Sequence, residues 1–277
     1  MGFRINTNVS SIAAQRSLTK SNRDSQSTLA KMSSGTRITK AADDAAGLAI
    51  SEKLKARIRS NSQANRNTND GISMVQTAEG GLDEISNMLT RLRELSVQTA
   101  SDTVGDTERG FTNMEYQNLK QEIERISQVT EFNGIKLLSG EGGILDFQVG
   151  VNNDEFQDRI SYNTASQNAK LDSLGLTSLD VSQKEGAQNS LAVIDNAIEK
   201  VSGQRASLGA IQNRLISTSN NLETTNENLS AANSRIRDVD YAAAAADNAK
   251  NNILGQAGTS VLTQANAQGQ NALRLLG

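Results

Sequence analysis

The sequence predicts a mainly α-helical fold, an elongated antiparallel helical bundle or coiled coil with a small β-hairpin region. One long segment in the C-terminal half carries apolar residues every seven positions, and a segment in the N-terminal half carries them three and four apart. Such spacings place apolar side chains on one seam of a helix that supercoils around a partner. Between these segments the apolar period changes to two, which is typical of β-strands.

The seven-residue series lies in the longest predicted helix, residues 191–236. At about 1.5 Å per residue this helix is a rod of roughly 65 Å, too long for an ordinary globular core. The partner position of the stripe turns polar from Arg205 onward, which indicates a fixed register or a further chain beyond the seam. Ser182 and Glu185 form a capping box, so the helix is predicted to begin there. The seam residues are Ile194, Val201, Leu208, Leu215, Leu222, Leu229 and Ile236.

The N-terminal half predicts two helices. Residues 1–33 form a sparse amphipathic pattern that ends at Gly35, and a second helix is expected from Asp43 or Asp44, where a carboxylate can cap it. The polar stretch 61–69 leaves open either a solvated helix or a break. The second helix then carries the natural partner of the C-terminal seam, which consists of Val75, Ala78, Leu82, Ile85, Leu89 and Leu92.

The middle of the chain is predicted to hold a third helix and a hairpin. Residues 102–106 read as a turn, and the third helix should end near residues 133–134. Apolar residues then alternate with others over 144–151, a turn follows, and residues 156–162 predict the second strand. Leucines within 171–179 are expected to fold back under this hairpin.

The segment 241–277 mirrors residues 1–33. Both are amphipathic, rich in small or polar residues, and too poor in apolar area to offset their conformational entropy alone. Both ends therefore read as helices that need a partner. This symmetry is the strongest indication of function that the residues give by themselves.

Composition argues against several functional classes. The net charge of −3 argues against a nucleic-acid footprint, and no apolar run is long enough to insert into a membrane. An apolar signal-peptide core is absent at the N-terminus, so conventional secretion with cleavage is not expected.

Chemistry-bearing residues are equally scarce. The chain has no His and no Cys, which removes the commonest general base and the soft metal ligands, and no phosphate-binding or calcium-binding motif occurs. The pair Asp43-Asp44 reads as a helix cap, and Asp154, Glu155 and Asp158 read as a solvated hairpin tip. We therefore expect no enzyme, no cofactor and no metal site. The chain also lacks Pro, which suits a polypeptide that must unfold, move and refold quickly.

Several long motifs resemble bacterial flagellin. The resemblance covers both terminal thirds of the chain. The matching stretches are RINTNVSSIAAQRSL (4–18), SSGTRITKAADDAAGLAIS (33–51), QANRNTNDGISMVQTAEGGLDEI (63–85), LTRLRELSVQTAS (89–101), EFNGIKLL (131–138), SRIRDVDYA (234–242) and ILGQAGTSVLTQANAQGQNALRLLG (253–277).

This resemblance implies a subunit that self-assembles into the flagellar filament, the propeller for swimming. Residues 1–40 and 238–277 would be terminal helices, largely disordered in the free monomer, that pair on assembly in the inner core, around which residues 41–237 form a helical rod with a hairpin region near 134–165. The large variable outer domains of many flagellins are missing. The residues expected to pack in the inner core are Ile5, Val9, Ile12, Leu18, Ile253, Val261, Leu262, Leu273, Leu275 and Leu276.

The resemblance also implies partners. They are the flagellar type III export apparatus, an export chaperone that binds the C-terminus, and the hook-filament junction and cap proteins. A contact with the animal Toll-like receptor for flagellin is implied at Arg91, Leu95 and Glu115, within the motif R-x-R-E-L-x-V-Q. Because Leu95 lies off the apolar stripe, we expect it to be at least partly exposed beside Arg91.

Two other classes share some of these features. The cytoplasmic helical hairpin of a chemoreceptor is also rich in Ala, Ser and Gln, but it would lack the hairpin between the rods and the amphipathic ends. A type III export tip or hook-junction protein would share the terminal helices and match the flagellin motifs less closely. Growth of long tubes from seeds, seen by electron microscopy, distinguishes the filament subunit from both.

Overall fold

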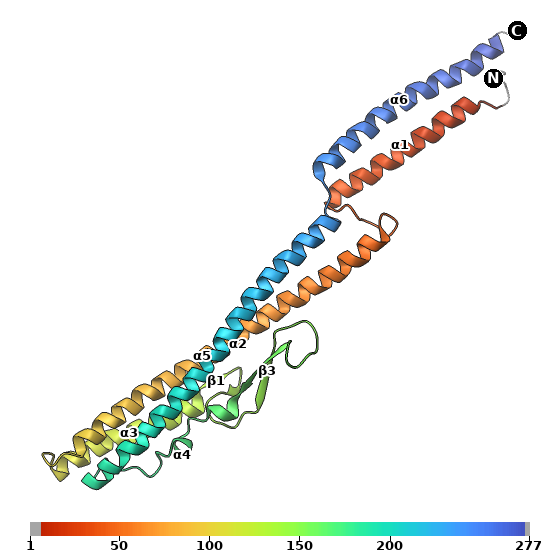
Figure 1. The fold of residues 1–277 in the computed structure, drawn as a ribbon. Helices are drawn as coiled ribbons and strands as arrows, with labels where there is room; N and C mark the ends of the chain where they lie inside the picture. Colours follow the sequence, from red (N-terminus) through yellow and green to blue (C-terminus); the bar gives the residue numbers. More distant parts are fainter. Residues whose placement is uncertain (1–6, 275–277) are drawn as a thin grey trace. The chain divides into compact units, whose positions relative to one another are not determined.

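The computed structural model describes residues 7–274, with side chains described through residue 267. It divides into two compact units, one of residues 59–227 and one of the remaining chain. Two long helices contribute to both units (Figure 1). The mainly α-helical fold with a small hairpin region is confirmed. The helices are α1 (Val9–Ser34), α2 (Ala45–Thr99), α3 (Asp106–Val129), α4 (Leu171–Leu174), α5 (Lys184–Arg237) and α6 (Tyr241–Arg274).

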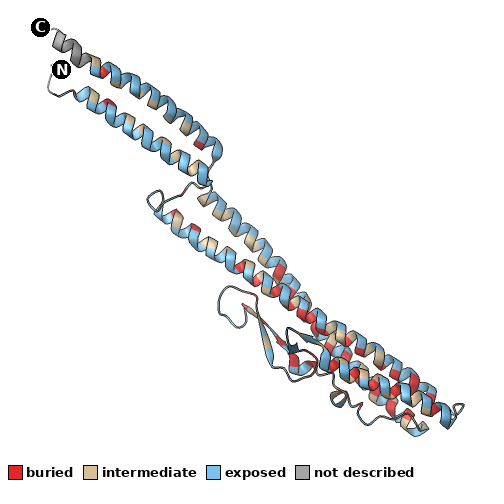
Figure 2. Cartoon of the chain, turned by 180° about the vertical axis from the view of Figure 1, so that it is seen from behind, coloured by how far each residue is buried: buried red, intermediate tan, exposed pale blue. Residues whose placement is uncertain are grey.

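The core of residues 59–227 lies between α2 and α5, with α3 and the hairpins packed beside them (Figures 1 and 2). Heptad spacing on both long helices turns one apolar stripe of each toward the other. Fully buried residues of these two stripes are Val75, Ala78, Leu82, Ile85, Leu89, Leu92, Ile194, Val201, Leu208 and Leu215.

The apolar seam does not continue along the whole of α5. Leu222 is only partly buried, unlike Leu215, and so are Leu229 and Ile236 farther along the helix. Polar pairs take over where the apolar stripe of α2 has ended. Ser219 Oγ donates to Asn65 Oδ1 over 2.7 Å, and Asn226 Nδ2 donates to Ser62 Oγ over 3.2 Å. The polar stretch of α2 is therefore an unbroken helix paired through hydrogen bonds.

Ion pairs flank the seam between the same helices. Arg205 contacts Glu79 at 2.7 Å and Asp83 at 2.9 Å, and Arg93 contacts Asp195 at 2.6 Å. Exposed pairs of this kind each contribute little stability. These ion pairs instead favour one register of the two helices, the antiparallel register in which the buried stripes face each other.

Two buried cations on α3 bind main-chain carbonyl groups of neighbouring segments. Arg109 donates to the oxygens of Thr99 and Ser101 at 3.1 and 2.9 Å, which satisfies carbonyl groups left unpaired where α2 ends. Lys120 Nζ donates to the oxygens of Thr177 and Leu179 at 3.1 and 2.9 Å. Burial lowers the pKa of Lys120, while the charge of nearby Asp180 opposes that shift.

Two small antiparallel hairpins follow α3. The first was not predicted, because residues 133–134 were expected only to end a helix. Asn133 and Gly134 both have positive φ, 50° and 79°, and this favours a tight hairpin turn. The strands are β1 (Glu131–Phe132) with β2 (Ile135–Lys136), and β3 (Ile144–Gln148) with β4 (Arg159–Asn163).

The second hairpin has shorter strands than predicted. Residues 149–158 form a loop because the buried Asp158 carboxylate accepts hydrogen bonds from the amides of Asn152 and Asp154 at 3.3 and 3.1 Å. Phe147 packs against α2 at Gly71, where an added Cβ would lie 3.1 Å from the ring. A glycine inside this helix thus permits the close approach of the hairpin.

The predicted capping box of α5 is wrong. The helix begins at Lys184, and the amide of Ser182 instead donates to Asp180 Oδ1 over 2.7 Å. Asp180 therefore fixes a turn that precedes the helix by several residues. The last turn contains Arg235 and Arg237, which suit a helix C-terminus.

Leu215→Ala should lower the free energy of unfolding of the monomer by about 2–5 kcal/mol, because it leaves a cavity in the fully buried seam. Leu222→Ala is the matched control and should cost about 1 kcal/mol, since Leu222 is already partly exposed. Chemical denaturation followed by circular dichroism measures both. Equal losses for the two variants would contradict this placement of the seam.

The stability of the fold should fall between pH 10 and 12. Burial raises the pKa of Tyr162 to about 12 from an ordinary value of 10.0, so the folded chain keeps a proton that the unfolded chain loses first. This contribution is fully present below pH 10 and lost as the pH rises through 12. Tyr162→Phe should remove about 2 kcal/mol of the decline in unfolding free energy across that range. A decline that is unchanged in Tyr162→Phe would assign it to other groups.

Candidate assembly surfaces

Helices α1 and α6 lie side by side (Figure 1). Polar pairs join them along their length: Asn8 Nδ2 donates to the Ala265 oxygen at 2.7 Å and Ser21 Oγ to the Asn251 oxygen at 2.9 Å. Gly258 faces Leu18, where an added Cβ would lie 3.3 Å from its methyl group. Small and polar residues therefore form most of the contact between these helices.

The same two helices leave most of their apolar side chains exposed (Figure 2). Val9 is 65% exposed and Ile253 66%, although both lie on apolar stripes. Leu18 and Leu262 are partly buried, and only alanines are buried on these helices within the described residues. Of the other residues expected in the inner core, Ile12 and Val261 are exposed, while Ile5 and the side chains of Leu273, Leu275 and Leu276 lie outside the described part.

The connectors that follow α1 and precede α6 are joined by main-chain hydrogen bonds. Thr36 and Asp238 form an antiparallel bridge, and Val239 N donates to the Gly35 oxygen at 3.0 Å. Gly35 takes φ of 68°, as a helix-terminating residue does. Asp43 accepts hydrogen bonds from the Thr39 hydroxyl and amide and then from the Lys40 amide, which lowers the pKa of its carboxyl group. The sequence predicted a short connector over residues 36–40, but not its pairing with residues 238–239, since no apolar period marks either segment.

A charged cluster joins the exposed faces of α2 and α3. Arg91 contacts Glu115 and Glu94, each at 2.9 Å, and all three side chains are about half exposed. Hydrogen bonds to Glu94 and then Glu115 raise the pKa of Arg91. The cluster therefore presents a fixed guanidinium flanked by carboxylates, available to a partner.

The expectation that Leu95 is exposed beside Arg91 is wrong. Leu95 is 2% exposed and belongs to the core, because α3 covers the face of α2 next to the heptad stripe. The hydroxyl groups of buried Tyr116 on α3 and buried Ser96 on α2 lie in the same region. Any partner at this patch thus meets Arg91 and Glu115, with Leu95 beneath them.

The described residues offer little for catalysis. No group of three or more acidic side chains within residues 7–267 is arranged to hold a metal ion. None of the described helices combines the length and apolar character that crossing a membrane requires. The prominent features are exposed apolar and charged surfaces on rigid helices, which suit binding to other proteins.

Comparison with protein families identifies both ends of the chain. Residues 5–142 match the bacterial flagellin N-terminal helical region, and residues 191–276 match the bacterial flagellin C-terminal helical region. Residues 143–190 lie between the two matches and hold the β3–β4 hairpin and α4. This short interval, all of it described by the structure, leaves no room for a large outer domain.

Curated relatives match over almost the whole chain. A flagellin of Halalkalibacterium halodurans is 43% identical over 272 residues, covering 98% of this chain and 99% of that protein. The flagellin of Bacillus subtilis is 43% identical and covers 99% and 100%. A flagellar filament core protein of Brachyspira hyodysenteriae is 41% identical and covers 98% and 99%.

Solved structures agree with the fold. The crystal structure of Bacillus cereus flagellin is 31% identical, with a TM-score of 0.51, and covers 57% of this chain and 88% of that one. A putative flagellar hook-associated protein of Vibrio parahaemolyticus shares the fold, with a TM-score of 0.58 and 15% identity, over 71% of this chain and all of the other. The chain belongs to the bacterial flagellin family, and it is a structural subunit of the extracellular flagellar filament rather than an enzyme.

Proposed function

We propose that α1 and α6 hold the filament together, by burying their exposed apolar faces against the same helices of neighbouring copies. The observation that carries this proposal is the exposure of Val9, Ile12, Ile253 and Val261 on two helices that are already paired. Apolar side chains that stay exposed after intramolecular pairing stabilise association when they are removed from water. Their repetition along both helices gives each copy more than one neighbour to bind.

The contact between α1 and α6 is limited, which supports the proposal that these two helices become ordered when the subunit assembles. Alanines such as Ala14 and Ala265 bury little area, and exposed hydroxyl–amide pairs add little net stability. The free energy of forming these helices must therefore come largely from the neighbouring copies. We further propose that in the filament residues 1–40 and 238–277 form the inner core and residues 41–237 form the surrounding rod. The compact units of the monomer divide at other positions, residues 58/59 and 227/228.

Other partners follow from the same role. Transport to the growing end through the flagellar type III export apparatus suits a chain that has no disulfide to break and no prolyl bond to isomerise. An export chaperone that covers α6 would keep exposed residues such as Ile253, Leu254 and Val261 from associating too early. The hook-filament junction and the cap would bind the same terminal helices at the two ends of the filament.

The Arg91 cluster is proposed as a contact for the animal Toll-like receptor for flagellin. Arg91 and Glu115 are exposed and held in one geometry by their ion pair, so their presentation to a receptor costs little ordering entropy. Leu95 acts only by supporting Arg91 from below. The same surface could pack against a neighbouring copy, in which case the intact filament would hide it.

Deletion of residues 1–33 or of residues 250–277 should abolish polymerisation. The helices of residues 59–227 should stay folded in both truncated proteins, because their core includes none of the deleted residues. Circular dichroism measures the remaining helix, and electron microscopy after seeding measures filament growth. Filaments grown from either truncated protein would refute the role of the terminal helices.

Arg91→Ala should lower signalling by the monomer in a receptor reporter cell by about tenfold, as expected for loss of an interface arginine. Arg93→Ala is the matched control, since Arg93 lies two positions away, is similarly exposed and pairs with Asp195 instead of α3. It should leave signalling within about twofold of the unchanged chain. Equal signalling by Arg91→Ala and the unchanged protein, both folded, would remove the receptor from the list of partners.

A further inference from the structure

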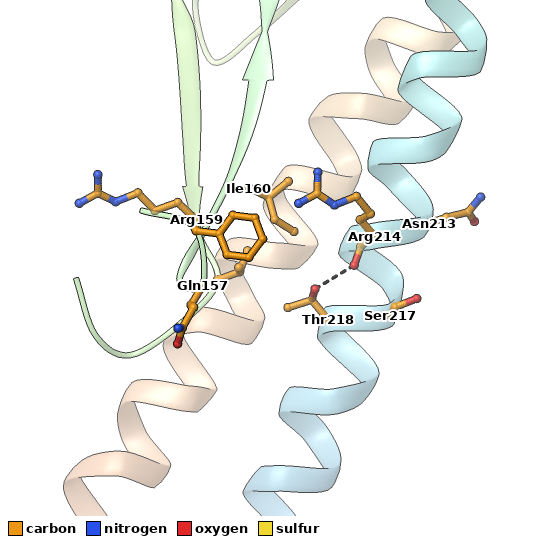
Figure 3. A pocket seen from close by; sticks show the side chains of 9 residues that line it. Gln157, Arg159, Ile160, Asn213, Arg214, Ser217 and Thr218 are labelled. Atoms are coloured by element: carbon orange, nitrogen blue, oxygen red, sulfur yellow. Dashed lines mark hydrogen bonds between the residues drawn. The ribbon is translucent and has the colours of Figure 1, made fainter. Parts of the chain in front are cut away.

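The β3–β4 hairpin and α5 enclose a groove of about 450 Å³ that no function described so far uses. Val149 and Ile160 form its apolar floor, and Arg159 and Arg214 are its charged residues. Ile160 and Arg214 lie between the hairpin and α5, whereas Arg159 points away from the helix (Figure 3). The groove is therefore apolar at its base and cationic at its rim.

The positive charges of this groove are not neutralised by any acidic side chain in the described part of the chain. Within residues 7–267, no carboxylate lies at ion-pair distance from Arg214 or from Arg159, and the residues that line the groove include no acid. By contrast, Arg93 and Arg205 on the long helices each pair with a carboxylate, Asp195 and Glu79 respectively. An unpaired cationic rim favours an acidic partner.

An exposed aromatic side chain stands at the same rim. Phe156 is 92% exposed in a chain with only 5 Phe and 3 Tyr. Its loop is held in place, because Asp154 Oδ1 accepts hydrogen bonds from the amides of Phe156 and Gln157 at 3.0 and 2.8 Å. A large apolar side chain kept in water on an ordered loop has the character of an interface anchor.

The first turns of α3 carry the complementary features, and we call them the acidic ridge. Asp106 and Glu108 lie in the first turn, followed by Phe111 and Met114, which are 65% and 59% exposed. Glu108 has no cation at ion-pair distance within the described residues, whereas Asp106 contacts Arg109 at 2.9 Å. The ridge thus offers a free carboxylate next to two apolar side chains.

Ridge and groove lie at different levels of the same unit. Glu115 pairs with Arg91, which places Phe111 level with about residue 95 of α2. Arg205 pairs with Glu79 and Ser219 with Asn65, which places Arg214 level with about residue 70. At 1.5 Å per residue the two surfaces are roughly 40 Å apart along α2, so they do not meet within one copy.

We propose that the groove of one copy receives the acidic ridge of a second copy, with Glu108 at Arg214 and the apolar ridge residues beside Phe156. The contact is heterologous, because it joins two different surfaces, and a bound pair of copies still has one ridge and one groove free. Such contacts build open rows of copies rather than closed dimers. The stagger between ridge and groove sets neighbouring copies roughly 40 Å apart along the row.

This inference rests on the proposed function, since it supplies a second contact to the same filament. A second copy is favoured over another acidic protein for two reasons. The carboxylate and the apolar side chains of its acidic ridge complement the groove, and in a filament other copies are always close by. The terminal helices and the ridge–groove contact belong to different units of the chain, so they can be tested separately.

The test is a charge exchange in the full-length chain. Arg214→Glu and Glu108→Arg should each raise the critical concentration for seeded growth by at least about tenfold. Combining both substitutions in one chain should restore it to within about threefold of the unchanged protein. Arg214→Lys is the matched control that keeps the charge, and it should stay close to the unchanged protein.

Thermal melting checks that each monomer is folded. Glu108 lies near the start of α3, so Met114→Arg serves as a second ridge variant with no helix-capping role, and it should also be rescued by Arg214→Glu. Normal growth of Arg214→Glu, or no rescue in either double variant, would overturn the contact and leave the filament proposal standing. Absence of filaments from the unchanged chain would overturn both.

Discussion

The buried seam between α2 and α5 is the interaction on which the rest of the structure depends. Without it, neither helix would be stable, because helices in proteins gain most of their stability from tertiary packing. The seam fixes an antiparallel register, and that register brings Arg93 to Asp195 and Arg205 to Glu79. It also positions the carbonyl groups at the end of α2 for Arg109, which links α3 to the pair.

A second consequence is the uneven distribution of apolar area. Leu208 and Leu215 are fully buried, while Val9 and Ile253 on the terminal helices are largely exposed. In the assembly proposed above, residues 59–227 form the folded part of the monomer and the exposed apolar side chains of α1 and α6 bind other copies. Under that proposal association stabilises the terminal helices by mass action, so that their order depends on the concentration of subunits at the growing end.

The sequence predicted the parts of the fold that follow from periodicity. Heptad stripes predicted that Leu82 and Leu208 are buried, and alternation located the β3–β4 hairpin, because both patterns report which face of an element is buried. Contacts made by single polar residues were missed. Lys120 and Gln117 on α3 both donate to the Leu179 oxygen of a connector that is distant in the sequence. No periodic pattern marks such contacts, because each depends on a single polar side chain.

Two errors have a common physical cause. A helix end was predicted at residues 133–134 although Asn-Gly is the strongest short hairpin signal, and exposure was predicted for Leu95 although it lies beside the heptad stripe. In both cases the missed feature lies outside the two heptad stripes: the β1–β2 hairpin follows α3, and α3, although predicted as a helix, also buries the face of α2 next to its stripe. A seam of only two helices buries one stripe, whereas α3 widens the buried face of α2. Which surfaces remain exposed is therefore decided largely by α3 and the hairpins, since the acidic ridge lies on α3 and the groove lies between the β3–β4 hairpin and α5.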